Sequence, residues 1–86
     1  GSIVIIGDIN SGAEVIAGEN IVVVGRIMGL AHAGAKGNKK AIIAAERIET
    51  PQIRISNIVK SIQKEAEEYS VRYTFAYVKE DKIELE

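Results

Sequence analysis

The sequence predicts an all-β solenoid, in which short strands wind into stacked coils. Two observations lead to this prediction: an internal repeat of about 18 residues, and an apolar content made of Ile, Val and Ala. Hydrophobic residues make up 47% of the 86 residues, but aromatic residues only 5%. Such aliphatic residues suit flat, repetitive strands better than a core built around large rings. The length predicts one small domain over residues 1–86.

The repeat appears when the sequence is compared with itself. Residues 2–9 match residues 20–27 at an offset of 18, through four β-branched residues, a glycine, a charged residue and an isoleucine. A weaker third copy at 41–48 follows at an offset of 21. The three additional residues fit the polar segment 36–40, which contains a glycine. A strand-rich unit of this length is typical of one solenoid coil.

The second halves of the first two copies also align. Residues 13–17 match 31–35 at the same offset of 18, and residues 53–55 are expected to follow in the third copy. Three short strands in each coil predict a triangular cross-section, with about three to four coils in all. We therefore expect repeat coils over 1–55, and an irregular segment with C-terminal strands as a cap over 56–86.

Side chains alternate along a strand, which separates inward from outward residues. Ile3, Ile5 and Ile9 are expected inward, because this phase continues past the glycine. The outward residues stack into apolar columns. A soluble monomer seldom exposes such a patch, so we expect a two-fold homodimer; the alternative is that the C-terminal segment folds over it. The predicted dimer interface is Val4, Ile6, Val22, Val24 and Ile43, with Ala45 at the end of one column.

The remaining outward positions are polar. Glu14, His32 and Arg54 are expected at equivalent places in the three copies. This second face is predicted to be solvated and free to bind a different partner.

The C-terminal third departs from the repeat after Pro51. Ile58, Ile62, Ala66 and Tyr69 have the spacing of one helix face, with Asn57 as a possible N-cap. The alternative is a charged loop at 64–68. Further on, the aromatic residues of 72–78 alternate as in a strand, a polar turn follows at 79–82, and 83–85 predicts a final strand. We interpret this aromatic segment as the cap of the solenoid.

No residue pattern points to catalysis, and we expect neither an enzyme nor a cofactor. His32 is the only histidine, and Asp8, Glu14 and Glu19 are too scattered for a metal site. The lysines of 36–40 are interpreted as a solvated loop. A net charge of -1 gives no case for nucleic acid, and no apolar run is long enough to span a bilayer. The absence of cysteine fits a cytoplasmic protein.

Residues 7–25 resemble the C-terminal domain of the bacterial division-site regulator MinC, above all in the Gly-Ala-Glu-Val-Ile-Ala run followed by Asn-Ile and a second glycine. Residues 28–37, 51–55 and 78–85 continue the resemblance. It implies a right-handed β-helix that forms a homodimer, binds the ATPase MinD and is thereby brought to the inner membrane surface.

The resemblance also implies a role in preventing septum formation by FtsZ at wrong sites, with FtsZ contacted mainly by an N-terminal domain outside this sequence. It suggests MinD contacts at Asp8, Asn10, Ser11, Gly12 and Glu14. Two features depart from the family: its Arg-Ser-Gly-Gln motif does not precede Ser2, and Leu30 replaces a basic residue. The alternatives are a bactofilin-like scaffold and, less favoured, a solenoid acyltransferase using His32 as general base.

Overall fold

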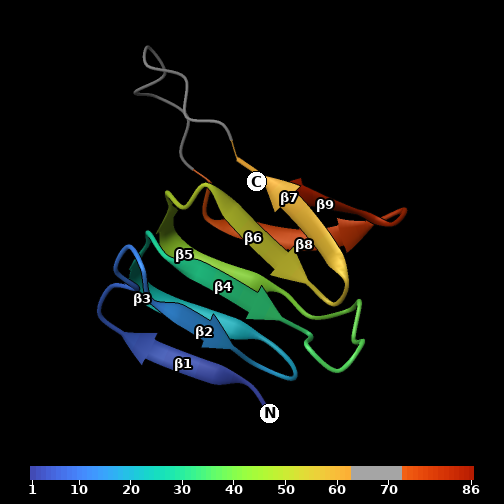
Figure 1. Cartoon of the computed structure of the whole chain (residues 1–86), viewed down its shortest axis with the longest axis horizontal. Coiled ribbons are helices and arrows are strands. Elements are labelled where there is room, and N and C mark those ends of the chain that lie inside the picture. Colours follow the sequence, from blue (N-terminus) through green and yellow to red (C-terminus); the bar gives the residue numbers. More distant parts are fainter. Residues whose placement is uncertain (63–72) are drawn as a thin grey trace.

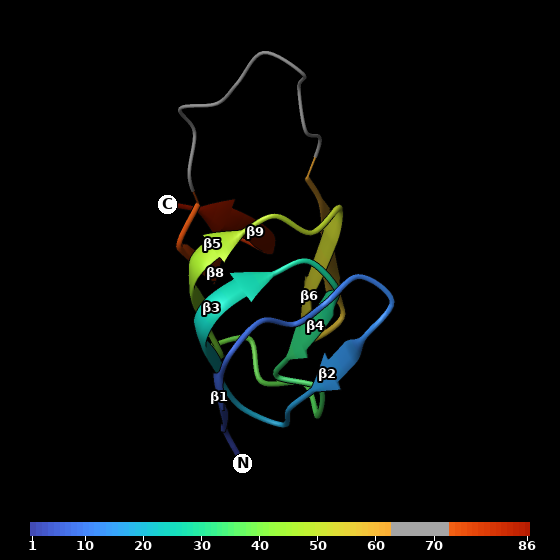
Figure 2. The same ribbon diagram turned by 90° about the vertical axis from the view of Figure 1, so that its left-hand side faces the viewer.

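The computed structural model describes residues 1–62 and 73–86 (Figure 1). These residues form nine strands and no helix, which confirms the predicted all-β class. Two sheets face each other in Figure 2, one of five strands in the order β1-β3-β5-β8-β9 and one of four in the order β2-β4-β6-β7. The strands are β1 (Ile3–Ile6), β2 (Glu14–Ile16), β3 (Ile21–Ile27), β4 (Leu30–Ala33), β5 (Ile43–Ile48), β6 (Gln52–Ile55), β7 (Ile58–Ser61), β8 (Phe75–Lys79) and β9 (Lys82–Leu85).

The chain alternates between the two sheets as it winds. Strands β1, β3 and β5 pair in parallel in the first sheet, and β2, β4 and β6 pair in parallel in the second. Each coil thus gives one strand to each sheet. Ile3 pairs with Ile21 and Ile6 with Val24, which confirms the offset of 18 between the first two copies.

The third copy is displaced by one residue from its predicted register. Ile43 pairs with Ile21 and Ala45 with Val23, at an offset of 22, whereas Arg47 pairs with Arg26 at an offset of 21. A bulge between Val23 and Arg26 absorbs the difference. A one-residue shift moves a side chain to the other face.

The prediction that Ile43 faces outward is therefore wrong, because this side chain is fully buried. Ala45 shares its inward phase, since it pairs with the buried Val23. Ala44 takes the outward place beside Val22 instead.

The second halves of the first two coils are offset by 16 residues, not 18. Glu14 pairs with Leu30, and Ile16 with His32. The cause is the corner between the strands, which holds six residues between Gly7 and Glu14 but only four between Gly25 and Leu30. Glu14 is thus not equivalent to His32, whereas the predicted match of His32 with Arg54 is confirmed.

The core lies between the two sheets and is almost wholly aliphatic. The inward side chains predicted for the second coil are confirmed, because Ile21, Val23 and Ile27 are at most 2% exposed. In the first coil, at the end of the stack, Ile3 and Ile5 are only partly buried. The buried apolar residues are Ile9, Ala17, Ile21, Val23, Ile27, Ala31, Ala33, Ala41, Ile43, Ile48, Ile53, Ile55, Ala76 and Ile83.

Hairpins end both sheets beyond the repeat. Residues 58–61 form β7, antiparallel to β6, so the helix predicted to begin here is wrong. Pairing of Ile58 with Ile55 explains this, because it satisfies the backbone in a tight turn. Ala66, Tyr69 and the alternative loop 64–68 lie outside the described residues. The predicted C-terminal strand, turn and strand are confirmed as β8, Glu80-Asp81 and β9.

In residues 1–62 and 73–86, no helix has the length and apolarity needed to cross a membrane.

Candidate interaction surfaces

The outward side of the five-stranded sheet is apolar. We call it the apolar face and define it by Val4, Ile6, Val22, Val24 and Ala44. Ile6 is 87% exposed, Val4 66% and Val24 50%. The β8–β9 hairpin pairs with the edge of β5 and so extends the sheet sideways. This hairpin does not fold over the apolar face, which was the alternative to self-association.

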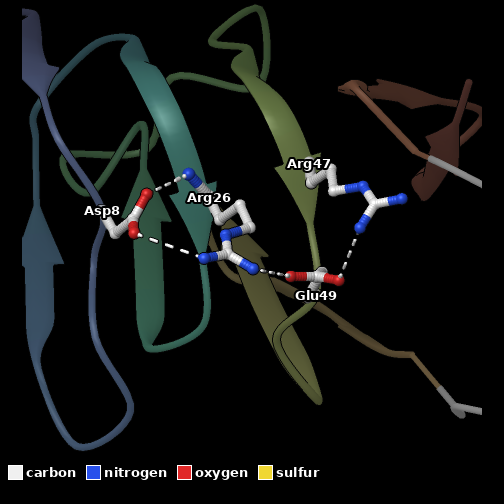
Figure 3. Close-up of polar contacts among 4 residues, drawn as sticks. All are labelled: Asp8, Arg26, Arg47 and Glu49. Carbon is white, nitrogen blue, oxygen red and sulfur yellow. Dashed lines mark hydrogen bonds and ion pairs between the residues drawn. The ribbon is translucent and has the colours of Figure 1, made fainter.

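A ladder of charged residues crosses the three coils at one end of this face (Figure 3). Arg26 lies 3.9 Å from both the Asp8 and the Glu49 carboxylate, and Arg47 lies 3.6 Å from Glu49. Asp8 also accepts a 2.8 Å hydrogen bond from the backbone N–H of Arg26. The exposed ion pairs stabilise little, but the backbone bond anchors the coil beside the bulge. Glu46 lies next to this ladder, on the same shallow surface depression.

Sequence reasoning missed this ladder. The charged residue after the glycine of each of the first two copies was the available signal, since Asp8 and Arg26 have opposite sign. Glu49 lay outside the matched segments, so its part in the ladder had no counterpart in the repeat.

The structure brings together the five residues suggested for partner binding. Asp8, Asn10, Ser11, Gly12 and Glu14 are all exposed, on the corner loop between β1 and β2 and at the first residue of β2.

This corner loop is held by hydrogen bonds from the next coil and by a hydrogen bond within the loop itself. The buried Ile9 accepts hydrogen bonds at its carbonyl from the N–H groups of Met28 and Gly29, at 2.7 and 3.1 Å. The N–H of Ala13 donates to the Asn10 carbonyl at 3.0 Å, and Gly12 has a φ of 86°, which favours glycine. The loop is thus a defined surface with its polar side chains outward.

The outward side of the four-stranded sheet is mixed in character. Ile16, His32 and Arg54 form one row across β2, β4 and β6, and Ile16 is 51% exposed. His32 Nε2 lies 2.8 Å from the Ser56 carbonyl, which can only accept, so Nε2 donates. This bond ties β4 to the turn between β6 and β7. The face predicted to be polar therefore contains an exposed apolar residue.

The described residues show no group of three or more His, Cys, Asp or Glu side chains that could hold a metal ion. Within the same ranges the lysine loop makes one ion pair, from Lys39 Nζ to Asp81 at 3.1 Å. The features that stand out are an apolar sheet face, a charged ladder and an anchored corner loop. An exposed apolar face of this kind is typical of a surface that binds another protein.

The chain belongs to the family described as "Septum formation inhibitor MinC, C-terminal domain", whose model matches residues 1–86. It is similar to the probable septum site-determining protein MinC of Heliobacterium modesticaldum, with 41% identity over the whole chain and 30% of that relative. The corresponding protein of Clostridium novyi is 52% identical over 69% of this chain and 28% of its own length. The chain thus spans about a third or less of these relatives.

The fold is similar to a solved structure as well. A chain of the "MinC:MinD cell division protein complex" from Aquifex aeolicus superimposes with a TM-score of 0.88 and 36% sequence identity. The match covers 100% of this chain and 70% of the other.

Proposed function

We propose that this chain is the dimerisation and partner-binding domain of a MinC-like cell-division inhibitor. In this proposal it binds the ATPase MinD and helps to prevent septum formation by FtsZ at wrong sites. The observation that carries the proposal is the whole-chain match, at 36% identity and a TM-score of 0.88, to a chain of a complex named for MinC and MinD. FtsZ contacts are assigned mainly to an N-terminal domain outside this sequence.

Self-association is proposed through the apolar face. Val4, Ile6 and Val24 are exposed to water in a single chain. Covering them with a second copy would stabilise the dimer by about 25 cal/mol per Å² of apolar area buried. Val22 lies between them. Ile43 is left out of the proposed interface, because it is buried in the core of its own chain.

The MinD contact is proposed on the corner loop, through Asp8, Asn10, Ser11, Gly12 and Glu14. Its support is the anchoring of Ile9 and Ala13, which presents the loop in one conformation and so lowers the entropy lost on binding. The loop begins at Asp8, at one end of the apolar face, and ends at Glu14, on the other sheet. MinD would then bring a cytoplasmic protein to the inner membrane surface.

We also propose that the coils wind as a right-handed triangular β-helix. The two sheets would form two sides. The parallel bridge between Ile9 and Ile27, continued by the 2.8 Å hydrogen bond from the Glu49 N–H to the Ile27 carbonyl, supports a short third side.

Sedimentation of the wild type beside Val22→Asp/Val24→Asp tests the self-association. We expect a wild-type dimer and a folded monomeric variant, because two carboxylates would be desolvated in the interface. Ile16→Asp is the matched control, since Ile16 is also half-exposed but lies on the other sheet. A variant that stays dimeric would refute the interface, and wild-type filaments would favour a scaffold.

A pull-down with MinD and ATP tests the second partner, using a chain extended upstream by its native residues. Ser11→Arg is expected to abolish capture, because it adds bulk and charge to the centre of the loop. Lys60→Glu, exposed on β7 at the opposite edge of the four-stranded sheet from β2, is the control for a change of charge. Equal capture of both variants would show that MinD binds elsewhere.

A further inference from the structure

The aromatic residues of β8 lie on the apolar side of their sheet. Ala76 is fully buried and pairs with the buried Ile43, so both face the core. Because side chains alternate, Phe75 and Tyr77 on either side of Ala76 face outward. Their rings are half-buried and lie with centroids 5.6 Å apart. The interpretation of these rings as a cap over the end of the core therefore does not hold for Phe75 and Tyr77.

These rings continue the apolar face without a break. Val4 pairs with Val22, Val22 with Ala44, and Ala44 with Phe75, so four apolar side chains form one row across β1, β3, β5 and β8. Tyr77 lies on the same side, two residues along β8. Aromatic residues are the type most enriched at the energetic centre of protein interfaces.

We infer that Phe75 and Tyr77 form the aromatic part of the self-association face, and that a second copy of this chain thereby fixes the C-terminal hairpin. This inference rests on the proposed self-association. It adds that the hairpin, which closes the sheet, is itself part of the interface.

The charges at the two ends of the face favour a second copy as the occupant. Lys79 and its partner Lys82 lie outward at one end, because they share the phase of Tyr77, whose own partner Glu84 lies outward further along β9. Glu46 lies at the opposite end, beside the ladder of Asp8. A two-fold axis that runs across the strands places the basic end of one copy against Glu46 of the other.

The hairpin is joined to its own chain at several points. The N–H groups of Ala45 and Ile48 donate to the carbonyls of Thr74 and Tyr73, just before β8, at 3.0 and 2.8 Å. Among the described residues, two pairs join β8 to β5 in register, whereas five join β3 to β5. A partner that covers the outward rings would add contacts along β8, so dimerisation would further stabilise the hairpin.

A single tryptophan reports on this surface, because the chain has none. Tyr77→Trp keeps a large ring on the face, and Val59→Trp, at an exposed site on β7, is the matched control. Each variant is diluted across the dimer dissociation range, which sedimentation of the same samples defines. Quenching by acrylamide and the emission maximum are recorded.

We expect Tyr77→Trp to be blue-shifted and several-fold less quenched in the dimer than after dilution, with no change for Val59→Trp. A reporter at 77 that is equally quenched in dimer and monomer would overturn this inference and leave the proposed dimer standing. Failure of the wild type to dimerise at any concentration would overturn both.

A second variant tests the energy rather than the exposure. Phe75→Ser is expected to raise the dimer dissociation constant about thirtyfold, as for an interface hot spot. Lys82→Ser, on the same hairpin, should change it less than threefold, as expected for a charge at the rim. Circular dichroism confirms that both variants keep their strands. Equal dissociation constants for the wild type and Phe75→Ser would overturn the inference.

Discussion

Gly29→Ala is expected to be among the most destabilising single-methyl additions in this chain. Gly29 is buried at the corner between β3 and β4, and its N–H donates to the Ile9 carbonyl at 3.1 Å. A Cβ at this position would overlap the carbonyl oxygens of Asn10 and Ala13 in the preceding coil. Backbone of a neighbouring coil cannot rotate away as a side chain does, so the coils would have to separate.

The cost follows from what that separation breaks. The hydrogen bonds from Leu30 to Ala13 and from Gly29 to Ile9, at 2.9 and 3.1 Å, join the two coils at this contact. Losing them costs about 1 kcal/mol each, and overpacking adds about 1–3 kcal/mol. We therefore expect a loss of about 4 kcal/mol, from a total of about 4–13 kcal/mol for a domain of this size.

Gly37→Ala is the matched control. Gly37 has a φ of 96°, but nothing lies within 4 Å of the added Cβ. Only the backbone conformation is penalised, at about 1–2 kcal/mol. Urea unfolding at one fixed protein concentration measures both variants, since dimerisation would make the midpoint depend on concentration. If Gly29→Ala costs no more than Gly37→Ala, the close approach of the coils is not what requires glycine.

Three further substitutions test single contacts by urea unfolding. Asn20→Ala removes the acceptor at 3.0 Å from the half-buried Ile42 N–H and should cost about 1–2 kcal/mol; an unchanged midpoint would show that water replaces it. His32→Ala should cost about 1 kcal/mol by releasing the Ser56 carbonyl, with faster amide exchange in β7. Arg26→Met should cost under about 1 kcal/mol, because its ion pairs are exposed, and the difference should vanish in high salt.

The alternation of apolar residues predicted the fold best where the repeat is regular. Burial on one face repeats every second residue, so the inward phase of Ile21 and Val23 follows from the sequence alone. Their outward neighbours Val22 and Val24 follow by the same rule. The offset of 18 gave the pairing of β1 with β3 directly, since both strands begin at the same point of a coil.

The same rule failed at Ile43, because it depends on the residue count between strands. The insertion after Ala33 adds six residues up to Ile43, and the shorter corner after Gly25 removes two. The bulge before Arg26 then shifts the pairing by one, so the two ends of β5 have different offsets. Aligning the repeats by a shared glycine or charged residue therefore gives the correct register at only one end of β5. Bulges depend on hydrogen bonding between neighbouring coils, which a single sequence does not display.

A candidate site was easier to predict when its residues are close together in the sequence. The corner loop is contiguous in sequence, and the structure presents its residues together. The row of Ile16, His32 and Arg54 was misread, because corner lengths decide which residues stack. The aromatic row depends on the antiparallel pairing of Ala44 with Phe75. The repeat does not predict this contact, because Phe75 lies outside it.

The two proposed partners use the two kinds of structure that a solenoid offers. Strands stack in register, so their outward side chains form wide rows, and a flat apolar row suits a second copy with the same rows. Corners change length without disturbing the stack, so they can hold polar loops shaped for a different protein. Gly29 lies at the contact between a stacked coil and a corner loop. Because it has no side chain, its coil can pack directly against the corner loop of the preceding coil. The substitution that separates these coils should therefore weaken MinD capture more than it weakens dimerisation.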